Sequence, residues 1–113
     1  MNNIENTVYT LDYAPENIVT GTKVYYLRYP LRCLFEKEDD YYIIKSELID
    51  IIRTGETEEE AEQNFAEEFD FIYKRYNELP DTKLSKRIKV IKTFLNHIVE
   101  KEKNILSDEN EKD

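Results

Sequence analysis

The feature that most constrains the fold is a stripe of apolar residues at helical spacing between Thr57 and Pro80. Six residues recur at steps of three or four, which places them along one side of an α-helix: Ala61, Phe65, Phe69, Ile72, Tyr76 and Leu79. Thr57 followed three residues later by Glu60 is a capping-box pattern, which favours a helix start, and Pro80 prevents continuation. The sequence therefore predicts an amphipathic helix of about 20 residues.

The chain before this helix has the composition and alternation of β-strands. Aromatic and aliphatic residues gather in five short runs, at about 8–13, 23–29, 31–37, 41–45 and 48–53. The polar run Glu36–Asp40 lies between two of them and predicts a hairpin turn, and Gly55 ends the last run. These runs predict an antiparallel sheet of three or four strands.

A second amphipathic helix is expected after Pro80. Apolar residues repeat there at helical spacing, namely Leu84, Ile88, Ile91, Leu95 and Ile98. Asp81 or Thr82 is in position to cap this helix, and its expected span is 82–104. The remaining residues 107–113 are polar and charged, which predicts a flexible acidic tail.

The order of these elements predicts the fold class α+β. A small antiparallel sheet is expected to pack against the first helix, with a second long helix after it. A chain of 113 residues suits one domain with a modest core, expected over residues 1–106. The segment 8–22 is a candidate for an additional edge strand.

The balance of acidic and basic residues indicates which kinds of partner the chain can bind. The sequence holds 25 acidic and 16 basic residues, a formal net charge of -9 at pH 7, which repels nucleic-acid phosphates and anionic membrane surfaces. We therefore expect a basic protein partner, and neither direct DNA binding nor a membrane site. A single cysteine excludes an intrachain disulfide, and no export signal or membrane-spanning run is visible, so a soluble cytoplasmic protein is expected.

The start of the first helix carries a dense group of carboxylates. Glu58, Glu59 and Glu62, with Asp70 further along, are the candidate contacts for a basic partner. The alternative is a solvated helix end, because carboxylates are favourable near the positive end of the helix dipole. Acid–base catalysis is not expected, since it requires a pocket that separates the pKa values of two groups, and no histidine accompanies these acids.

No catalytic, cofactor or metal site is expected elsewhere in the sequence. His97 lies on the second helix without the further histidines or cysteines of a metal set. Cys33 alternates with Leu31 and Phe35, which favours a buried apolar role over that of a nucleophile. Two glycines are too few for a phosphate-binding loop. The sequence therefore favours a non-catalytic protein without a cofactor.

Five basic residues, hereafter the basic run, lie around the second helix: Lys83, Lys86, Arg87, Lys89 and Lys92. The segment from Thr82 to Val99 contains no acid. Three interpretations stay open. The basic run is a solvated helix face, or it docks against the acidic first helix of a second copy in a homo-oligomer, or it contacts nucleic-acid phosphates. The overall negative charge weighs against the last.

The order of motifs from Tyr29 onward resembles the HicB-like antitoxin family. Members carry a Tyr-Pro strand, an acidic turn, a strand of the type GYYVA, a PELPG segment and a TxGDTxEEA helix start. The corresponding segments here are Tyr29-Pro30, Asp40-Tyr41-Tyr42, Ser46-Glu47-Leu48, Thr54-Gly55-Glu56-Thr57 and Glu59-Glu60-Ala61, with Asn64 and Glu67 after them. The resemblance covers residues 29–79, in a HicB-like core of 23–79.

This resemblance implies a three-stranded antiparallel sheet packed on a helix, with further strand pairing through a dimer partner. Family members commonly neutralise a small basic RNA-cleaving toxin, and many repress their own operon through a C-terminal DNA-binding module. The chain departs from the family pattern at Ser46–Asp50, which lacks the prolines and the glycine of PELPG. It departs again after Pro80, where one long helix is expected in place of a DNA-binding module, so operator binding is not expected.

The leading hypothesis is an antitoxin-like inhibitory protein that neutralises a basic RNase or another nucleic-acid enzyme through its acidic surface. One alternative is an acidic mimic of nucleic acid that inhibits a defence or replication enzyme. Another is a structural module whose helices build a homo-oligomer.

Overall fold

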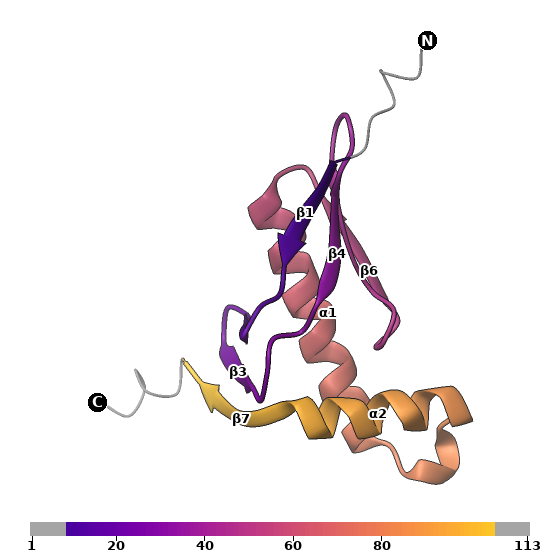
Figure 1. Cartoon of the computed structure of the whole chain (residues 1–113). Coiled ribbons are helices and arrows are strands. Elements are labelled where there is room, and N and C mark those ends of the chain that lie inside the picture. Colours follow the sequence, from indigo (N-terminus) through magenta and orange to yellow (C-terminus); the bar gives the residue numbers. More distant parts are fainter. Residues whose placement is uncertain (1–8, 106–113) are drawn as a thin grey trace.

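Two antiparallel sheets and two helices make up the fold in the computed structural model, which describes residues 9–105 (Figure 1). The elements follow in the order β1 (Tyr9–Tyr13), β2 (Asn17–Val19), β3 (Lys23–Leu27), β4 (Cys33–Lys37), β5 (Tyr42–Ser46), β6 (Ile51–Gly55), α1 (Glu58–Glu78), the short 3-10 helix η2 (Asp81–Lys83), α2 (Lys86–Ile98) and β7 (Val99–Asn104). The α+β class predicted from the sequence is confirmed. The expected tail 107–113 lies outside the described residues.

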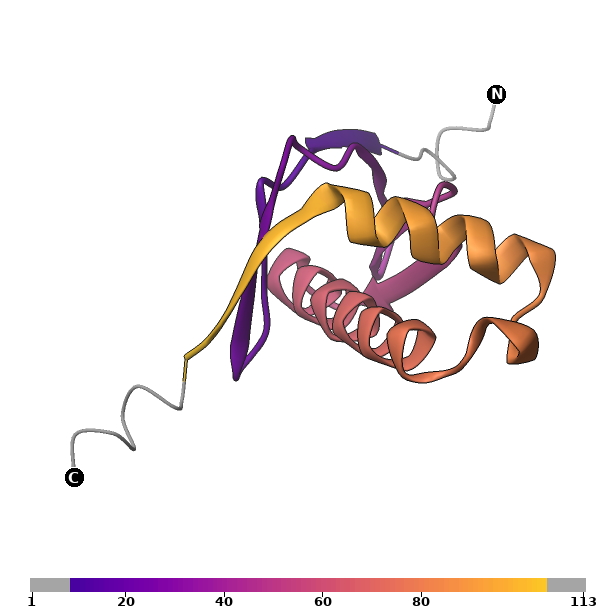
Figure 2. The same cartoon turned by 90° about the horizontal axis from the view of Figure 1, so that it is seen from below.

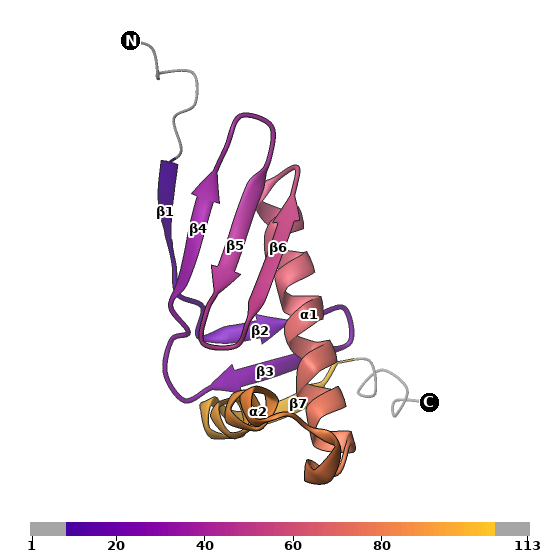
Figure 3. The same cartoon turned by 90° about the vertical axis from the view of Figure 1, so that its right-hand side faces the viewer.

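The first sheet has the strand order β1-β4-β5-β6, and α1 covers one of its faces (Figure 3). Alternation along the strands buries Phe35, Ile44 and Ile51 in the core and leaves Leu34 and Ile52 exposed on the opposite face. The predicted hairpin is confirmed, because β4 pairs with β5. The N-terminal segment supplies the expected edge strand, β1, which pairs with β4.

The second sheet, of order β2-β3-β7, was not expected from the sequence. Its strands run across the lower end of the first sheet (Figure 3). Tyr25 of β3 is fully buried, with its ring against Phe69 and Tyr73 of α1 at centroid distances of 5.5 Å and 5.1 Å. The prediction of one sheet with three or four strands is therefore wrong in number, since seven strands form two sheets that share α1 as a packing partner.

The first helix is confirmed almost residue for residue. The Thr57 hydroxyl accepts a hydrogen bond from the Glu60 N–H at 3.0 Å, as the capping box predicts, while the Glu60 carboxylate accepts from the Glu56 N–H at 2.6 Å. The helix ends at Glu78, two residues before Pro80. Its buried residues are Ala61, Phe65, Ala66, Phe69 and Ile72, so the apolar stripe forms the centre of the core.

The predicted second helix over 82–104 is wrong at both ends. Ser85, rather than Asp81 or Thr82, is the cap, and its hydroxyl accepts from the Ile88 N–H at 3.1 Å. The helix ends at Ile98, and residues 99–104 continue as β7 beside β3 (Figure 2). Glu and Lys favour a helix there locally, but the open edge of β3 offers a complete ladder of backbone hydrogen bonds, and this tertiary pairing prevails.

No helix within residues 9–105 combines the length and the apolar character needed to cross a bilayer.

Candidate functional site

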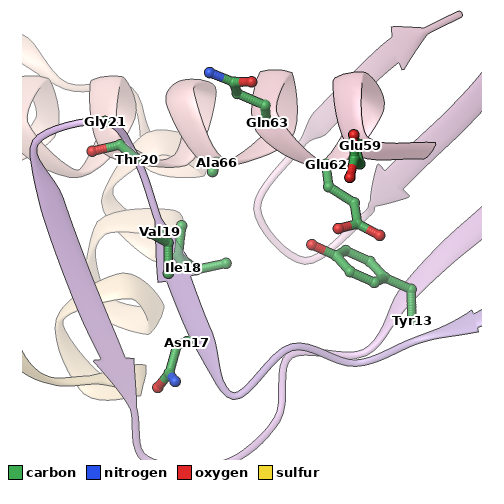
Figure 4. A pocket seen from close by; sticks show the side chains of 10 residues that line it. All are labelled: Tyr13, Asn17, Ile18, Val19, Thr20, Gly21, Glu59, Glu62, Gln63 and Ala66. Carbon is green, nitrogen blue, oxygen red and sulfur yellow. The ribbon is translucent and has the colours of Figure 1, made fainter. Parts of the chain in front are cut away.

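A groove of about 410 Å³ lies between the β1–β2 segment and the first turns of α1 (Figure 4). Tyr13, Ile18 and Val19 line one wall. Glu59 and Glu62 line the other, where they project from consecutive turns of the helix. The groove therefore combines an aromatic and aliphatic wall with a carboxylate wall.

The apolar wall is fixed by packing on the core. The Tyr13 ring meets Phe35 edge to face at a centroid distance of 5.3 Å and Phe65 at 6.4 Å. Ile18 is buried, whereas the next residue, Val19, is 52% exposed at the rim of the groove because β2 alternates. This wall of the groove therefore combines packed core side chains with one exposed apolar residue, Val19.

Burial and repulsion between neighbouring carboxylates make the charged form of the carboxylate wall unfavourable. Burial raises the pKa of Glu62, and the neighbouring charges of Glu58 and Glu59 raise it further. Burial and the charge of Glu62 also raise the pKa of Tyr13. Figure 4 shows the Glu62 carboxylate and the Tyr13 hydroxyl pointing toward each other. Both shifts show that this part of the groove disfavours further negative charge.

Three of the four predicted acidic contacts lie together. Glu58 and Glu59 are exposed at the start of α1, and Glu62 is half-buried one turn later. The hairpin turn between β4 and β5 lies at the same end of the molecule (Figures 1 and 3). The term acidic end refers below to the carboxylates of these two segments: Glu38, Asp39, Asp40, Glu56, Glu58, Glu59, Glu60 and Glu62.

Asp70 is not part of the acidic end. Its carboxylate accepts a hydrogen bond from the Tyr25 hydroxyl and lies 3.2 Å from the Lys74 ammonium, and its side chain is only 18% exposed. Asp70 is therefore engaged inside the fold.

The basic run lies around α2, at the opposite end of the molecule (Figure 1). Arg87 donates to the Glu47 carbonyl at 2.8 Å and lies 3.4 Å from Asp50, and Lys92 forms an ion pair with Asp81 at 2.9 Å. The hydrogen bond from Lys92 lowers the pKa of Asp81. Lys83, Lys86 and Lys89 are exposed. Two members of the basic run thus hold intramolecular contacts, and three face solvent.

Cys33 and His97 lie away from the groove lining. Burial raises the pKa of the Cys33 thiol to about 12, so the thiol stays protonated at neutral pH and is a poor nucleophile. His97 is exposed on α2, with its ring 5.8 Å from that of Tyr29. Among residues 9–105, no group of three histidine, cysteine or acidic side chains is arranged to hold a metal ion.

The sequence did not point to Tyr13, Ile18 and Val19 as site residues. Asn17–Val19 forms a strand only because it pairs with β3, and this pairing carries it past the start of α1. The local signal for this wall is the alternation of residues around Tyr13. It predicted a strand, but it did not indicate that α1 faces this strand across the groove.

Comparisons with protein-family models, with curated proteins and with solved structures found no match to this chain. The acidic end and its groove are therefore the features from which a function is inferred.

Proposed function

We propose that this chain is a non-catalytic, antitoxin-like inhibitor that binds a basic protein through its acidic end. A cationic side chain of the partner enters the groove between Tyr13 and the Glu59–Glu62 wall, and the remaining carboxylates of the acidic end attract other positive charges of the partner. The partner expected from the resemblance to HicB-like antitoxins is a small basic RNase.

One observation carries this proposal, the position of Glu59 and Glu62 on one wall of a groove whose other wall is formed by Tyr13, Ile18 and Val19. Partial burial and two neighbouring carboxylates disfavour the charged form of Glu62. In the part of the chain that the structure describes, no lysine or arginine lines the groove. A lysine or arginine of a partner would relieve the repulsion, so binding a cation is favourable here in a way that it is not at an ordinary solvated helix end.

Affinity requires more than charge, because exposed ion pairs are weak and screened by salt. Val19 is 52% exposed at the groove, and Tyr41, in the hairpin turn at the acidic end, is 39% exposed. These two residues are the apolar anchors expected to supply much of the affinity, with the carboxylates guiding encounter and orientation.

The resemblance supports the kind of partner as well as the mode of binding. An antiparallel sheet covered by a capped helix is what the HicB-like motifs lead one to expect, and β4, β5, β6 and α1 have this arrangement. An inhibitor of this kind acts by covering the substrate-binding surface of an RNase, which must be basic to attract RNA.

The test is quantitative affinity capture from the native cell with three forms of the chain. The wild type is compared with Glu59→Gln/Glu62→Gln and with a control, Glu47→Gln/Glu100→Gln, which removes the same charge from two exposed residues away from the groove. We expect the wild type and the control to recover a basic protein that the groove variant loses, and the recovered protein to have RNase activity that the wild type inhibits.

Recovery of no basic protein, or equal recovery by all three forms, contradicts the proposal. Recovery of a DNA-processing enzyme that duplex DNA releases from the complex would instead favour a mimic of nucleic acid.

A further inference from the structure

Two segments that meet at α2 differ in charge from the rest of the chain. Residues 17–35 and 82–99 contain none of the 25 acidic residues. They contain eight of the 16 basic ones, which are Lys23, Arg28, Arg32 and the five members of the basic run. The segments lie side by side, because Arg28 donates its side-chain Nε–H to the His97 carbonyl at 2.9 Å, and the Tyr29 ring contacts the His97 ring. A chain with a net charge of -9 thus gathers half of its bases here.

Five of these eight bases have no carboxylate partner. Lys23, Arg87 and Lys92 form ion pairs at 3.0, 3.4 and 2.9 Å. Within residues 9–105, the others form no ion pair: Arg28, Arg32, Lys83, Lys86 and Lys89. Lys86 and Lys89 also lie in the first turns of α2, near the positive end of the helix dipole, where cations are unfavourable. Two of the unpaired charges are therefore unfavourable for the helix that carries them.

The outward side of α2 carries apolar residues beside these lysines. Val90, Thr93, Phe94 and His97 follow one another at helical spacing and line an open hollow of about 430 Å³. Val90 is 60% exposed, and Phe94 is half-buried. The buried residues of α2 are different ones: Ile91, Leu95 and Ile98. The apolar surface of α2 therefore extends beyond the stripe that packs on the core.

Positive charge lies at both ends of this hollow. Lys86 lies one helical turn before Val90, and Lys89 one turn before Thr93, so both precede the hollow along α2. Arg28, bonded to the His97 carbonyl, lies at the other end. The term α2 face refers below to Val90, Phe94, His97 and Tyr29 together with Arg28, Lys86 and Lys89.

We propose that the α2 face binds an acidic amphipathic helix of a partner protein. Apolar residues of such a helix, at steps of three and four, pack on Val90 and Phe94. Its carboxylates pair with Lys86 and Lys89 and offset the repulsion between these lysines and the helix dipole. Charge complementarity thus selects an acidic partner for a chain whose overall charge is itself negative.

A protein helix fits this face better than a nucleic acid does. Phosphates could meet the lysines, but a strand needs a continuous basic groove, and the centre of the α2 face is apolar. The net charge of -9 also repels a long polyanion more strongly than a short helix with a few carboxylates.

The test is the binding of labelled helical peptides of about 15 residues to the full chain, measured by fluorescence anisotropy. The first peptide carries leucines at steps of three and four and glutamates at most other positions. The second has lysines in place of the glutamates, and the third has the composition of the first in scrambled order. We expect only the first to bind, with an affinity that falls as salt rises.

Two positive charges are removed to test the electrostatic part. Lys86→Gln/Lys89→Gln should weaken binding of the glutamate peptide by about fivefold at low salt. Lys37→Gln/Lys45→Gln removes the same charge from β4 and β5 of the first sheet and should bind as the wild type does. Thermal unfolding shows that each variant is folded, and loss of Lys86 and Lys89 should not lower the melting temperature.

Two exposed valines are compared to test the apolar part. Val90→Ser should weaken binding by about fivefold, because it removes apolar surface that the peptide buries. Val19→Ser is the control, since Val19 is similarly exposed but lies in the groove beside the start of α1. The α2 variants leave the acidic end unchanged, so they should still recover the basic protein, and failure of one proposal leaves the other standing.

The proposal is overturned if the glutamate peptide does not bind at millimolar concentration, or if the lysine or scrambled peptide binds equally well. Equal affinities for the α2 variants and their controls also overturn it. A single-stranded RNA that binds this face more tightly than the peptide would assign it to nucleic acid. Self-association of the wild type that Val90→Ser abolishes would assign it to a second copy. Either result contradicts the proposal.

Discussion

The hydroxyl of Tyr25 on β3 donates a hydrogen bond to the carboxylate of Asp70 on α1. The Tyr25 side chain is fully buried, and Lys74, one helical turn from Asp70, lies 3.2 Å from the same carboxylate. This hydrogen bond joins the second sheet to α1, which also packs against the first sheet. It also explains why Asp70 does not join the acidic end, although its sequence context resembles that of the other candidates.

Removal of the Tyr25 hydroxyl should destabilise the fold without creating a large cavity. Tyr25→Phe leaves the Asp70 carboxylate partly buried without its buried donor, and a hydrogen bond to a charged group contributes about 2 kcal/mol. We expect a loss of this size in the free energy of unfolding measured in urea. Tyr26→Phe is the control, because the Tyr26 hydroxyl makes no hydrogen bond in residues 9–105. Equal losses in the two variants would show that the bond to Asp70 contributes nothing.

The two glycines should differ in their tolerance of a methyl group. A Cβ added at Gly55 would lie 2.3 Å from the Ala61 backbone N, so β6 and the start of α1 must move apart. No atom lies within 4 Å of a Cβ added at Gly21. Gly55→Ala should lower the free energy of unfolding by about 3 kcal/mol, and Gly21→Ala by less than about 0.5 kcal/mol. Similar melting temperatures for the two variants would contradict the close approach at Gly55.

Two buried hydroxyls should respond to removal in opposite ways. Within the described residues, the Ser46 hydroxyl is buried without a hydrogen-bond partner, whereas the Thr20 hydroxyl accepts from the Lys23 and Thr22 N–H groups at 3.0 Å and 3.2 Å. Ser46→Ala should leave stability unchanged or raise it by up to about 1 kcal/mol, since desolvation of the hydroxyl is relieved. Thr20→Ser keeps the turn bonds and Thr20→Ala removes them, so only the latter should lose about 1 kcal/mol. Chemical denaturation measures the free energy of unfolding of the three variants. A loss of stability in Ser46→Ala, or equal stability of Thr20→Ser and Thr20→Ala, would contradict the prediction.

Glu62 should limit stability at neutral pH. Its pKa is raised in the folded state, so the cost of its charge is fully present above the folded pKa and is relieved as the pH falls through that value. Glu62→Gln should therefore raise the free energy of unfolding at pH 7, by about 0.5 kcal/mol because the site is largely open to water. The gain should shrink in acid. Glu67→Gln makes the same charge change at an exposed position of the same helix and should give a smaller gain.

A variant that becomes more stable while it loses its partner is the expected sign of a binding site. Under the proposed docking, carboxylates in an unfavourable position stabilise the complex rather than the free fold. If Glu62→Gln lowered stability at pH 7, the burial of the Glu62 charge and its repulsion with Glu58 and Glu59 would not be the dominant effects at this site.

The parts of the fold that could be predicted from the sequence are those with local signals. The cap at Thr57, the stop at Pro80 and the stripe from Ala61 to Ile72 lie within one element, and all of them favour the same helix. The β4–β5 hairpin is equally local, because a short polar turn joins strands that are adjacent in sequence.

The strand β7 could not be predicted in this way. Glu100, Lys101 and Glu102 favour a helix by intrinsic propensity, and the strand forms only because β3, more than 70 residues earlier, has an open edge. The salt bridge between Lys23 and Glu102 at 3.0 Å joins the same two distant segments. Pairing between segments so far apart in the sequence cannot be recognised from the local pattern of residues in either segment.

The candidate site also has a part that could be predicted from the sequence and a part that could not. Glu58, Glu59 and Glu62 were predicted because acids at a helix start are visible in sequence. The facing wall was not predicted, because Val19 is positioned by the second sheet and Tyr13 by the pairing of β1 with β4.

The most direct test of the central claim is calorimetric titration of the captured basic protein into the wild type, Glu59→Gln/Glu62→Gln and Glu47→Gln/Glu100→Gln, at low and at high salt. The groove and control variants carry the same net charge, so a general electrostatic attraction predicts equal affinities. The proposed docking predicts that the groove variant alone loses affinity, by about tenfold or more, and that the difference narrows as salt rises. Equal dissociation constants for the two variants would contradict it.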